Sequence, residues 1–296
     1  GIETHVIEFA PMLMAEQLDQ MGGEQLRRKI ESMGVRVHTS KNTLEIVQEG
    51  VEARKTMRFA DGSELEVDFI VFSTGIRPRD KLATQCGLDV APRGGIVIND
   101  SCQTSDPDIY AIGECASWNN RVFGLVAPGY KMAQVAVDHI LGSENAFEGA
   151  DLSAKLKLLG VDVGGIGDAH GRTPGARSYV YLDESKEIYK RLIVSEDNKT
   201  LLGAVLVGDT SDYGNLLQLV LNAIELPENP DSLILPAHSG SGKPSIGVDK
   251  LPDSAQICSC FDVSKGDIAK AVAEGHTTLA AIKQHTKAGT GCVGCV

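Results

Sequence analysis

The chain has 296 residues, and its 42% of hydrophobic and 23% of charged residues are typical of a globular protein with room for two domains. Its 28 basic and 40 acidic side chains give a net charge of -12, which argues against the broad basic face that binds nucleic acid. No apolar run reaches the roughly 18 residues that a membrane helix needs, so no membrane partner is expected. We expect a cytoplasmic protein with reduced thiols available to metals. Because it begins at Gly1 within an apolar run, we also expect it to be part of a longer polypeptide.

The first third of the chain predicts a nucleotide-binding α/β unit. A β-prone run at residues 4–8 precedes a helical pattern over 17–33, which Gly34 is expected to end, and a second strand follows at 35–38. The apolar stripe of this helix consists of Leu18, Met21, Leu26, Ile30 and Met33.

Glu8 is a candidate ligand of NADH. In a complete dinucleotide-binding unit, an acid at the end of the unit's second strand accepts hydrogen bonds from the adenosine ribose hydroxyls. Glu8 would be that acid if residues 4–8 correspond to the second strand of such a unit. Its charge disfavours a 2'-phosphate, which favours NADH over NADPH. The alternative is a solvated glutamate, because the Gly-x-Gly-x-x-Gly turn that should come before does not occur in this chain.

An extended hairpin is predicted next, with arms at residues 51–59 and 64–72 and a turn at Asp61-Gly62. Its second arm ends in the apolar run 69–72, which is typical of a buried strand. The run stops abruptly at Ser73-Thr74-Gly75.

Residues 103–116 contain a second nucleotide motif, Gln-Thr-Ser-Asp-Pro-Asp-Ile-Tyr-Ala-Ile-Gly-Glu-Cys-Ala, which predicts a turn, a short apolar strand and a Gly-acid pair. It resembles the second flavin-binding motif of the two-dinucleotide-domain flavoprotein reductases, T-x-x-P-x-I-Y-A-x-G-D. The resemblance implies FAD, with Gly113 against its pyrophosphate and Glu114 holding a ribityl hydroxyl. This chain has Glu where the family has Asp, and the alternative is an ordinary strand and turn with an exposed acid.

The same family offers a reading of two further segments. Residues 69–78, Phe-Ile-Val-Phe-Ser-Thr-Gly-Ile-Arg-Pro, resemble the apolar strand and T-G-x-x-P turn between the NAD and FAD domains, so Gly75 and Ile76 are expected close to a nucleotide. A helix beginning at Pro128 resembles the helix that the family aims at the flavin ring. Tyr130 is expected either beside that ring or as a cap of the core. The apolar face of this helix is Met132, Val135, Ala136 and Ile140.

Three cysteines, Cys86, Cys102 and Cys115, lack a paired spacing and are expected to be small buried thiols. Since no redox-active pair accompanies the flavin motif, a disulfide reductase is not expected.

A small α+β domain is predicted from about residue 152. Strands at 176–182, 188–194 and 201–207 precede a Leu-rich amphipathic helix at 213–224. This part resembles the C-terminal domain of rubredoxin-reductase-like flavoproteins. A segment rich in Pro, Gly and Ser then predicts a linker.

The last thirty-nine residues contain four cysteines in two pairs, Cys258-Ser-Cys260 and Cys292-Val-Gly-Cys295, with 31 residues between the pairs. Spacers of one and two residues let both thiolates of a pair face one metal centre. The alternative is four unrelated buried or disulfide-forming thiols.

Two short helices are predicted between the pairs. Ser264 to Asp267 is a plausible capping box, Gly275 ends the first helix, and Thr278 opens the second. The arrangement resembles the small [2Fe-2S] domain of the bacterioferritin-associated ferredoxins, which implies that all four cysteines ligate the cluster. Structural zinc uses the same four thiolates, so the spacing leaves zinc open.

Together these parts predict an incomplete α/β two-dinucleotide-domain flavoprotein with a small α+β domain and a C-terminal helical [2Fe-2S] domain. The expected boundaries are 1–75 for the remainder of the NAD-binding domain, 76–150 for the C-terminal part of the FAD-binding domain, 151–226 for the α+β domain, 227–256 for the linker and 257–296 for the [2Fe-2S] domain.

In this order, the whole chain resembles the large subunits of bacterial NADH-dependent nitrite reductases of enterobacterial type. The resemblance implies that electrons pass from NADH through FAD and the [2Fe-2S] cluster toward sirohaem and a [4Fe-4S] centre outside this chain, where nitrite is reduced to ammonia. It also implies the nitrite reductase small subunit and further copies of the chain as candidate partners. No residue of this chain is expected to be catalytic.

Two other functions stay open. One is the electron-transfer subunit of assimilatory nitrate reductase or another NADH-dependent flavoprotein reductase, and the other is a structural zinc-binding interaction module. The first flavin fingerprint, the NAD glycine turn and the sirohaem part do not occur in this chain. We therefore expect it to be inactive alone and to bind FAD weakly or not at all.

Overall fold

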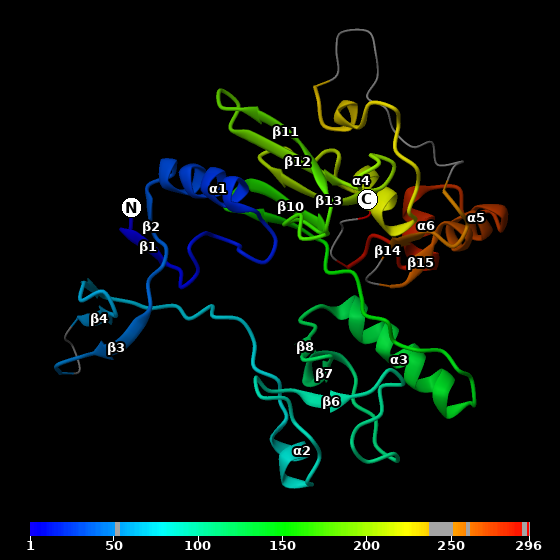
Figure 1. Ribbon diagram of the computed structural model, residues 1–296, viewed down its shortest axis with the longest axis horizontal. Helices are drawn as coiled ribbons and strands as arrows, with labels where there is room; N and C mark the ends of the chain where they lie inside the picture. The colour runs from blue at the N-terminus through cyan, green and yellow to red at the C-terminus, as the bar shows by residue number, and fades with distance from the viewer. Residues whose placement is uncertain (51–53, 237–250, 259–260, 292–294, 296) are drawn as a thin grey trace. The chain divides into compact units, whose positions relative to one another are not determined.

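The computed structural model describes residues 1–50, 54–236, 251–258, 261–291 and 295 (Figure 1). The chain forms two compact units, and we call residues 1–72 and 153–251 unit 1 and residues 73–152 and 252–296 unit 2. In the described part of the chain, no helix has both the length and the apolar character needed to cross a membrane.

The N-terminal β-α-β succession of unit 1 is confirmed. Strand β1 (Thr4–Ile7) pairs in parallel with β2 (Val35–His38), and helix α1 (Gln20–Ser32) connects them. The helix begins later than predicted because the carboxylate of Asp19 caps it, accepting a hydrogen bond from the Gly22 N–H at 2.9 Å. Gly34 follows the helix with a φ of +88°, as a C-terminal stop requires.

The apolar stripe of α1 is only partly as predicted. Met21 and Met33 are 47% and 46% exposed, whereas Leu26 and Ile30 are buried. Gly22 belongs to the buried face, because a Cβ there would lie 3.0 Å from a methyl of Val205. The helix thus approaches the neighbouring sheet on its glycine side, which hydrophobicity alone does not reveal.

A three-stranded sheet follows, with strand order β3-β4-β5. The predicted turn at Asp61-Gly62 is confirmed, and Gly62 has a φ of +80°. The partner strand β3 was not predicted, and residues 51–53 of the expected first arm lie outside the described residues. The strands are β3 (Thr43–Val47), β4 (Lys55–Phe59) and β5 (Glu64–Val67).

The prediction of a buried strand at residues 69–72 is wrong. Phe69, Val71 and Phe72 are 78%, 73% and 70% exposed, and the segment has extended, unpaired backbone. A buried strand needs neighbours along both edges, and among the described residues no strand pairs with this run.

The rest of unit 1 is a five-stranded antiparallel sheet with the order β11-β12-β13-β10-β9, and it confirms the three predicted strands. Helix α4 (Tyr213–Leu221) follows, and the short 3-10 helix η2 (Pro230–Leu233) lies within the segment predicted as a linker. Residues 237–250 of that segment lie outside the described residues. The strands are β9 (Ala154–Leu158), β10 (Val161–Gly167), β11 (Arg177–Asp183), β12 (Ile188–Val194) and β13 (Leu201–Val207).

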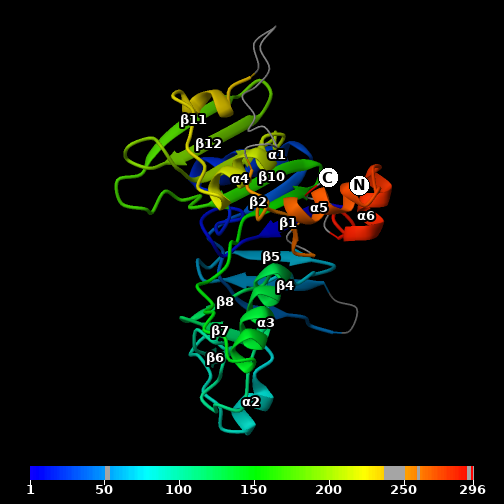
Figure 2. The ribbon, with the colours of Figure 1, turned by 90° about the vertical axis from the view of Figure 1, so that its right-hand side faces the viewer.

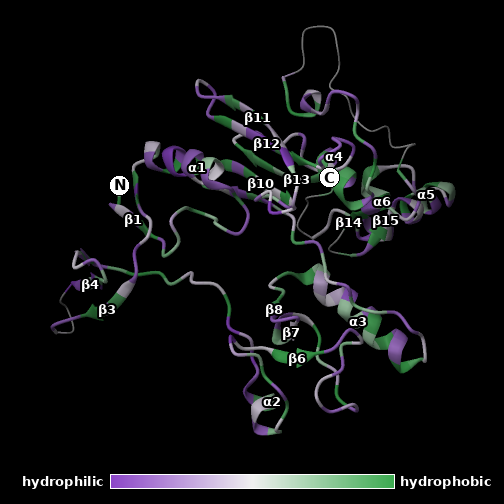
Figure 3. Cartoon of the chain, in the orientation of Figure 1, coloured by the Kyte–Doolittle hydropathy of each residue, from purple (hydrophilic) through white to green (hydrophobic). Residues whose placement is uncertain are grey.

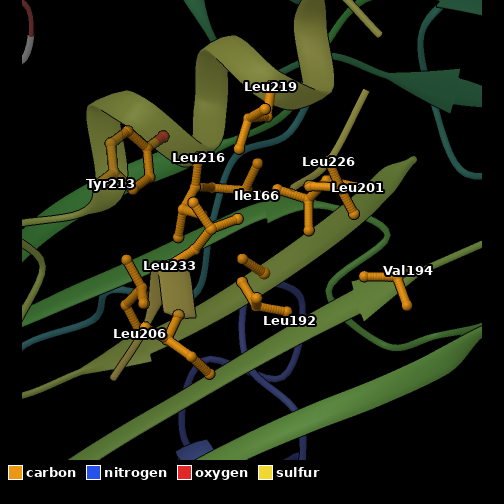
Figure 4. Packing of buried hydrophobic residues seen from close by; sticks show 12 residues of the cluster. Ile166, Leu192, Val194, Leu201, Leu206, Tyr213, Leu216, Leu219, Leu226 and Leu233 are labelled. Carbon is orange, nitrogen blue, oxygen red and sulfur yellow. The ribbon is translucent and has the colours of Figure 1, made fainter. Parts of the chain in front are cut away.

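The inner strands β10, β12 and β13 of this sheet are buried on both faces. On one face, Leu216 and Leu219 of α4 pack against Ile166 and Leu206 of the strands, as Figure 4 shows. On the other face, α1 packs against alternate residues of the same strands, including Val205. Successive residues of a strand point to opposite faces, so a sheet covered on both sides needs continuous apolar runs such as that of β13.

Polar contacts reinforce both packed faces. Asp19, besides capping α1, accepts hydrogen bonds from the Tyr189 hydroxyl at 2.7 Å and from Nη1 of Arg191 at 2.9 Å. Lys190, which lies between them in β12, is 1% exposed, and its Nζ contacts carboxylates of Asp209 at 2.5 Å and Asp212 at 2.6 Å.

The first part of unit 2 packs helix α3 (Val126–Ile140) beside strands β7 (Ala116–Trp118) and β8 (Arg121–Val122), as Figures 1 and 2 both show. Strand β6 (Ile96–Ile98), which is hydrophobic throughout in Figure 3, pairs with β7. Helix α2 (Lys81–Gln85) and the 3-10 helix η1 (Gly113–Cys115) complete this part.

Three predictions for this part are corrected. The short strand expected just before Gly113 does not form, and Tyr110 makes only an isolated bridge to Gln103, while the strand begins at Ala116. Helix α3 begins at Val126, two residues before Pro128. A proline fits the first turn of a helix, because the backbone nitrogens there have no hydrogen-bond acceptor within the helix. Ile140, expected on the buried face of α3, is 65% exposed at the end of the helix.

The C-terminal part of unit 2 contains the two predicted helices, α5 (Lys265–Ala273) and α6 (Leu279–Thr286). The capping box is confirmed, since the Ser264 hydroxyl accepts from the Asp267 N–H and the Asp267 carboxylate accepts from the Ser264 N–H. Gly275 ends α5 with a φ of +98°. A short pair of strands, β14 (Gln256–Cys258) and β15 (Val263–Ser264), precedes the helices.

We expect Asp19→Ala to lower the free energy of unfolding by about 2–4 kcal/mol, because it removes the cap of α1 and leaves the buried Tyr189 hydroxyl without its acceptor. Urea unfolding followed by circular dichroism checks this. The control is Glu24→Ala on the same helix, which breaks exposed pairs with Arg27 and Arg28 and should cost about 0–1 kcal/mol. Equal losses in the two variants would contradict the role of Asp19.

We also expect Lys190→Met to lower stability by about 2–4 kcal/mol at pH 7, because two carboxylates lose their buried cation. In the wild type, burial disfavours the Asp209 carboxylate, but hydrogen bonds from Lys190 and Ser211 outweigh burial and hold its pKa well below the usual range. This contribution is therefore present at neutral pH and is lost as the pH falls below about 4.

Without Lys190, the Asp209 carboxylate loses one of the hydrogen bonds that lower its pKa, while burial and the hydrogen bonds from Ser211 remain. The stability difference between the wild type and Lys190→Met should therefore be largest near pH 7 and should shrink as the pH falls below about 4. Urea unfolding at pH 7 and at pH 3 checks this, and a difference that stays constant contradicts it.

Candidate functional site

An open cavity of about 360 Å³ lies in the first part of unit 2. It brings together two residues of the predicted nucleotide site, Ile76 and Glu114, which are far apart in the sequence. The lining consists of Ile76, Arg77, Pro78, Arg79, Glu114 and Cys115. The T-G-x-x-P turn and the Gly-acid pair thus form one surface.

Gly113 borders this surface, and its backbone conformation disfavours a residue with a side chain. Its φ is +74°, and no atom lies within 4 Å of the place that a Cβ would occupy. On its other side the turn packs against α3, since a Cβ on Gly129 would lie 3.4 Å from the Gly113 Cα. A ligand can therefore approach the Gly113 backbone directly, which fits the role expected for this glycine beside a pyrophosphate.

Gly75 and Tyr130 lie in the same unit but do not line the cavity. Gly75 has a φ of +83° and open space where a Cβ would point. Tyr130 is 51% exposed in the first half of α3, so it does not cap the core, and the expectation that places it beside a flavin stays a prediction.

Glu8 belongs to unit 1, so the structure does not join it with the other predicted nucleotide ligands. It follows β1, and its Oε1 accepts a hydrogen bond from the Ala10 N–H at 2.7 Å. The second carboxylate oxygen is left for a ribose hydroxyl, and that role stays a prediction.

Arg77 and Arg79 are the residues that sequence reasoning missed. Both line the cavity next to Glu114, and no ion pair joins either guanidinium to a carboxylate within the described residues. Two arginines beside an open backbone at Gly113 suit a diphosphate. Arg77 lies within the predicted T-G-x-x-P turn and Arg79 directly follows it, and this position is the signal that could have found them.

The C-terminal part of unit 2 brings two of the four predicted metal ligands together. Cys258, at the end of β14, is 2% exposed and packs in a small core that includes Cys295, Val263 and Ala288. Burial and a hydrogen bond with the Cys258 thiol raise the pKa of Cys295 to about 11. Cys260 and Cys292 lie outside the described residues.

This geometry fits a thiolate-ligated metal or cluster. The two thiols come from opposite ends of the segment, and each belongs to one of the predicted pairs. A metal binds the thiolate form, so a cation at this place would release the protons that these thiols hold. The assignment of all four cysteines as ligands stays a prediction.

The three unpaired cysteines differ from one another. Cys102 is buried, as predicted, and burial raises its pKa to about 11. Cys115 is half-buried in η1. Cys86 is exposed after α2, so the expectation that it is buried is wrong; it follows a helix of five residues that buries only Ala83.

The N-terminal part of the chain is similar to a known family of proteins. Residues 1–139 match the pyridine nucleotide-disulphide oxidoreductases. A FAD-dependent pyridine nucleotide-disulphide oxidoreductase from Desulfovibrio vulgaris shares the fold with a TM-score of 0.59, at 24% identity over 75% of this chain and 57% of that one. The chain therefore has the pyridine nucleotide-disulphide oxidoreductase fold.

Two further parts of the chain match known domains. Residues 153–224 match the rubredoxin NAD+ reductase C-terminal domain, and residues 256–296 match the BFD-like [2Fe-2S] binding domain. The predicted fold class is confirmed. FAD, a pyridine nucleotide and a [2Fe-2S] cluster are confirmed as cofactors by these matches, whereas the preference for NADH over NADPH stays a prediction.

The predicted resemblance to nitrite reductase large subunits is also confirmed. The chain is 95% identical over its whole length to the nitrite reductase (NADH) large subunit of Escherichia coli and 57% identical to the nitrite reductase [NAD(P)H] large subunit of Klebsiella oxytoca. It spans only 35% and 31% of the length of these two relatives.

We expect iodoacetamide at neutral pH to alkylate Cys86 at least about tenfold faster than Cys102, because Cys86 is exposed whereas burial keeps Cys102 protonated. Peptide mass spectrometry over time measures both rates, and a Cys86→Ser chain serves as the control for peptide assignment. Equal rates would contradict the burial of Cys102.

Proposed function

We propose that this chain is the electron-input part of an NADH-dependent nitrite reductase large subunit. Electrons enter from NADH, pass through FAD and the [2Fe-2S] cluster, and leave toward sirohaem on a part of the polypeptide outside this chain, where nitrite is reduced to ammonia. The observation that carries the proposal is the contact between Cys258 and Cys295, because it assembles thiols of both pairs in a chain with a flavoprotein fold.

The residues around the cavity in unit 2 suit the flavin. Arg77 and Arg79 would neutralise the diphosphate, Gly113 would let it approach the backbone, and Glu114 would accept a hydrogen bond from a ribityl hydroxyl. When bound, FAD supplies the conversion of a two-electron hydride into single electrons. Gly75 and Ile76 would lie beside the nucleotide, Tyr130 would lie beside the ring, and Glu8 would hold the ribose of NADH.

Cys258, Cys260, Cys292 and Cys295 would hold the cluster. Val263, Ile268 and Ala288 pack around the two described thiols and would exclude water from them. A low-dielectric surrounding and thiolate ligands are among the factors that set the potential of such a centre. The chain itself would bind and relay electrons, and bond chemistry on nitrite would take place elsewhere.

We also propose partners and a cellular location for the protein. It includes the nitrite reductase small subunit and further copies of the chain as partners, and the cytoplasm as location, where thiols stay reduced.

A second function is favoured by a specific comparison. The chain is 36% identical over its whole length to the assimilatory nitrate reductase electron transfer subunit of Bacillus subtilis, of which it spans 37%. Both functions use the same input path, and the sequence that follows residue 296 in the gene would separate them. A zinc-binding interaction module is the third reading, and metal analysis tests it.

We expect the chain, after anaerobic incubation with iron and sulfide, to bind about two iron atoms and to show the visible absorption of a [2Fe-2S] cluster. Cys258→Ser and Cys295→Ser should each lose most of that absorption, because a hydroxyl is a poorer ligand than a thiolate. Iron and sulfide analysis with electron paramagnetic resonance of the reduced chain measures this.

Cys86→Ser is the matched control, since it removes an exposed thiol of the same unit and should keep the cluster. A colourless wild-type chain that holds one zinc and no sulfide would contradict the electron-transfer proposal.

A further inference from the structure

A second group of metal-ligating side chains lies on the helices of the C-terminal part, apart from the cysteines. Glu274, His276 and His285 each offer one ligand atom, and the three atoms lie within 4.8 Å of one another. Nε2 of His285 lies 3.4 Å from Oε2 of Glu274. The two imidazole rings are stacked with centroids 4.2 Å apart and an angle of 28° between their planes.

The local backbone fixes two of these residues. Glu274 is the C-cap of α5, and Gly275 and His276 follow it in a Schellman turn, in which the Gly275 N–H donates to the Val272 carbonyl and the His276 N–H to the Ala271 carbonyl, both at 3.0 Å. His276 therefore leaves α5 in one defined direction. His285 comes from the last turn of α6, so the group joins the ends of two helices.

The negative charge of Glu274 is unfavourable at the C-terminus of α5, where Lys270 is the basic residue of the last turn. The C-terminus of a helix carries a partial negative charge, and a carboxylate at that end is repelled by it. A cation held between Glu274 and the imidazoles would reverse this repulsion, since it would face both the carboxylate and the last carbonyls of α5.

An ion pair between His285 and Glu274 does not explain why the imidazole of His276 stacks on that of His285. A protonated His285 would pair with Glu274, but the same charge would disfavour a second imidazolium stacked at 4.2 Å. Two imidazoles and a carboxylate whose ligand atoms lie within 4.8 Å of one another have the donor set that divalent zinc, copper and nickel prefer.

The dimensions agree with a tetrahedral centre. Metal–ligand bonds of about 2.0–2.1 Å place neighbouring tetrahedral ligand atoms roughly 3.3 Å apart, close to the 3.4 Å between His285 and Glu274. The remaining pairs, at up to 4.8 Å, need movements of about 1 Å, which exposed side chains make by small rotations. Three protein ligands leave a fourth position open to water or to a further ligand.

We propose that Glu274, His276 and His285 form a site for a divalent transition-metal ion, with Zn²⁺ as the probe, independent of the four cysteines. The ion links the end of α5 to the last turn of α6. Because these helices separate the two cysteine pairs in sequence, the ion also stabilises the scaffold that holds them.

Calorimetric titration of the whole chain with Zn²⁺ tests the site. The wild type should bind one Zn²⁺ more than His276→Ala or His285→Ala, in which affinity for that ion should fall at least about 100-fold. His170→Ala, which removes a half-buried histidine from unit 1, is the matched control and should keep the extra ion. Zinc-edge X-ray absorption should show that the ion lost in His285→Ala has nitrogen and oxygen ligands and no sulfur.

Glu274→Gln keeps the shape of the side chain and should weaken binding at least about tenfold, so it decides the test if a histidine variant fails to fold. The proposal is overturned if wild type, His276→Ala, His285→Ala and Glu274→Gln bind the same amount of Zn²⁺. It is also overturned if His170→Ala loses the same ion, or if the lost ion has sulfur ligands.

Discussion

Strand β12 holds the N-terminus of one helix on each face of the sheet, and unit 1 depends on this arrangement. Tyr189 and Arg191 point to one face and bind Asp19, the cap of α1, while Lys190 points to the other and binds Asp212, the N-cap residue of α4. The alternation of a strand makes this possible with three consecutive residues. Apolar packing supplies most of the stability on both faces, and the polar contacts fix where along the sheet each helix begins.

Much of this fold could be predicted wherever one local signal was sufficient. The capping box at Ser264 and Asp267, the glycine stops at Gly34 and Gly275, and the apolar runs of β11 to β13 depend on neighbours in sequence, and all were found. The misses depend on distant partners. Residues 69–72 have the composition of a buried strand, but strand formation needs other strands beside them, and composition does not say whether these are available.

The candidate site shows the same division. Spacing predicted the cysteines as ligands, because chemistry dictates how many residues separate two ligands of one centre, and a resemblance to a flavin-binding motif predicted the Gly-acid pair. Arg77 and Arg79 escaped notice because a basic residue in a loop is usually solvated, and only the fold reveals that both line the cavity beside Glu114. The group at Glu274 was likewise hidden, since His276 and His285 have no regular spacing and meet only where α5 and α6 end.

Asp19 and Tyr189 are 170 residues apart in the sequence, so the ribosome makes Tyr189 well after Asp19. At the speed of a ribosome, roughly ten to thirty seconds pass between the synthesis of α1 and that of the strand that holds it. Throughout this interval the apolar face of the helix, with Leu26 and Ile30, lacks the strands β12 and β13 that complete its hydrophobic cluster. The nascent chain is therefore most in need of a chaperone while residues 73–152, which belong to the other unit, are being made.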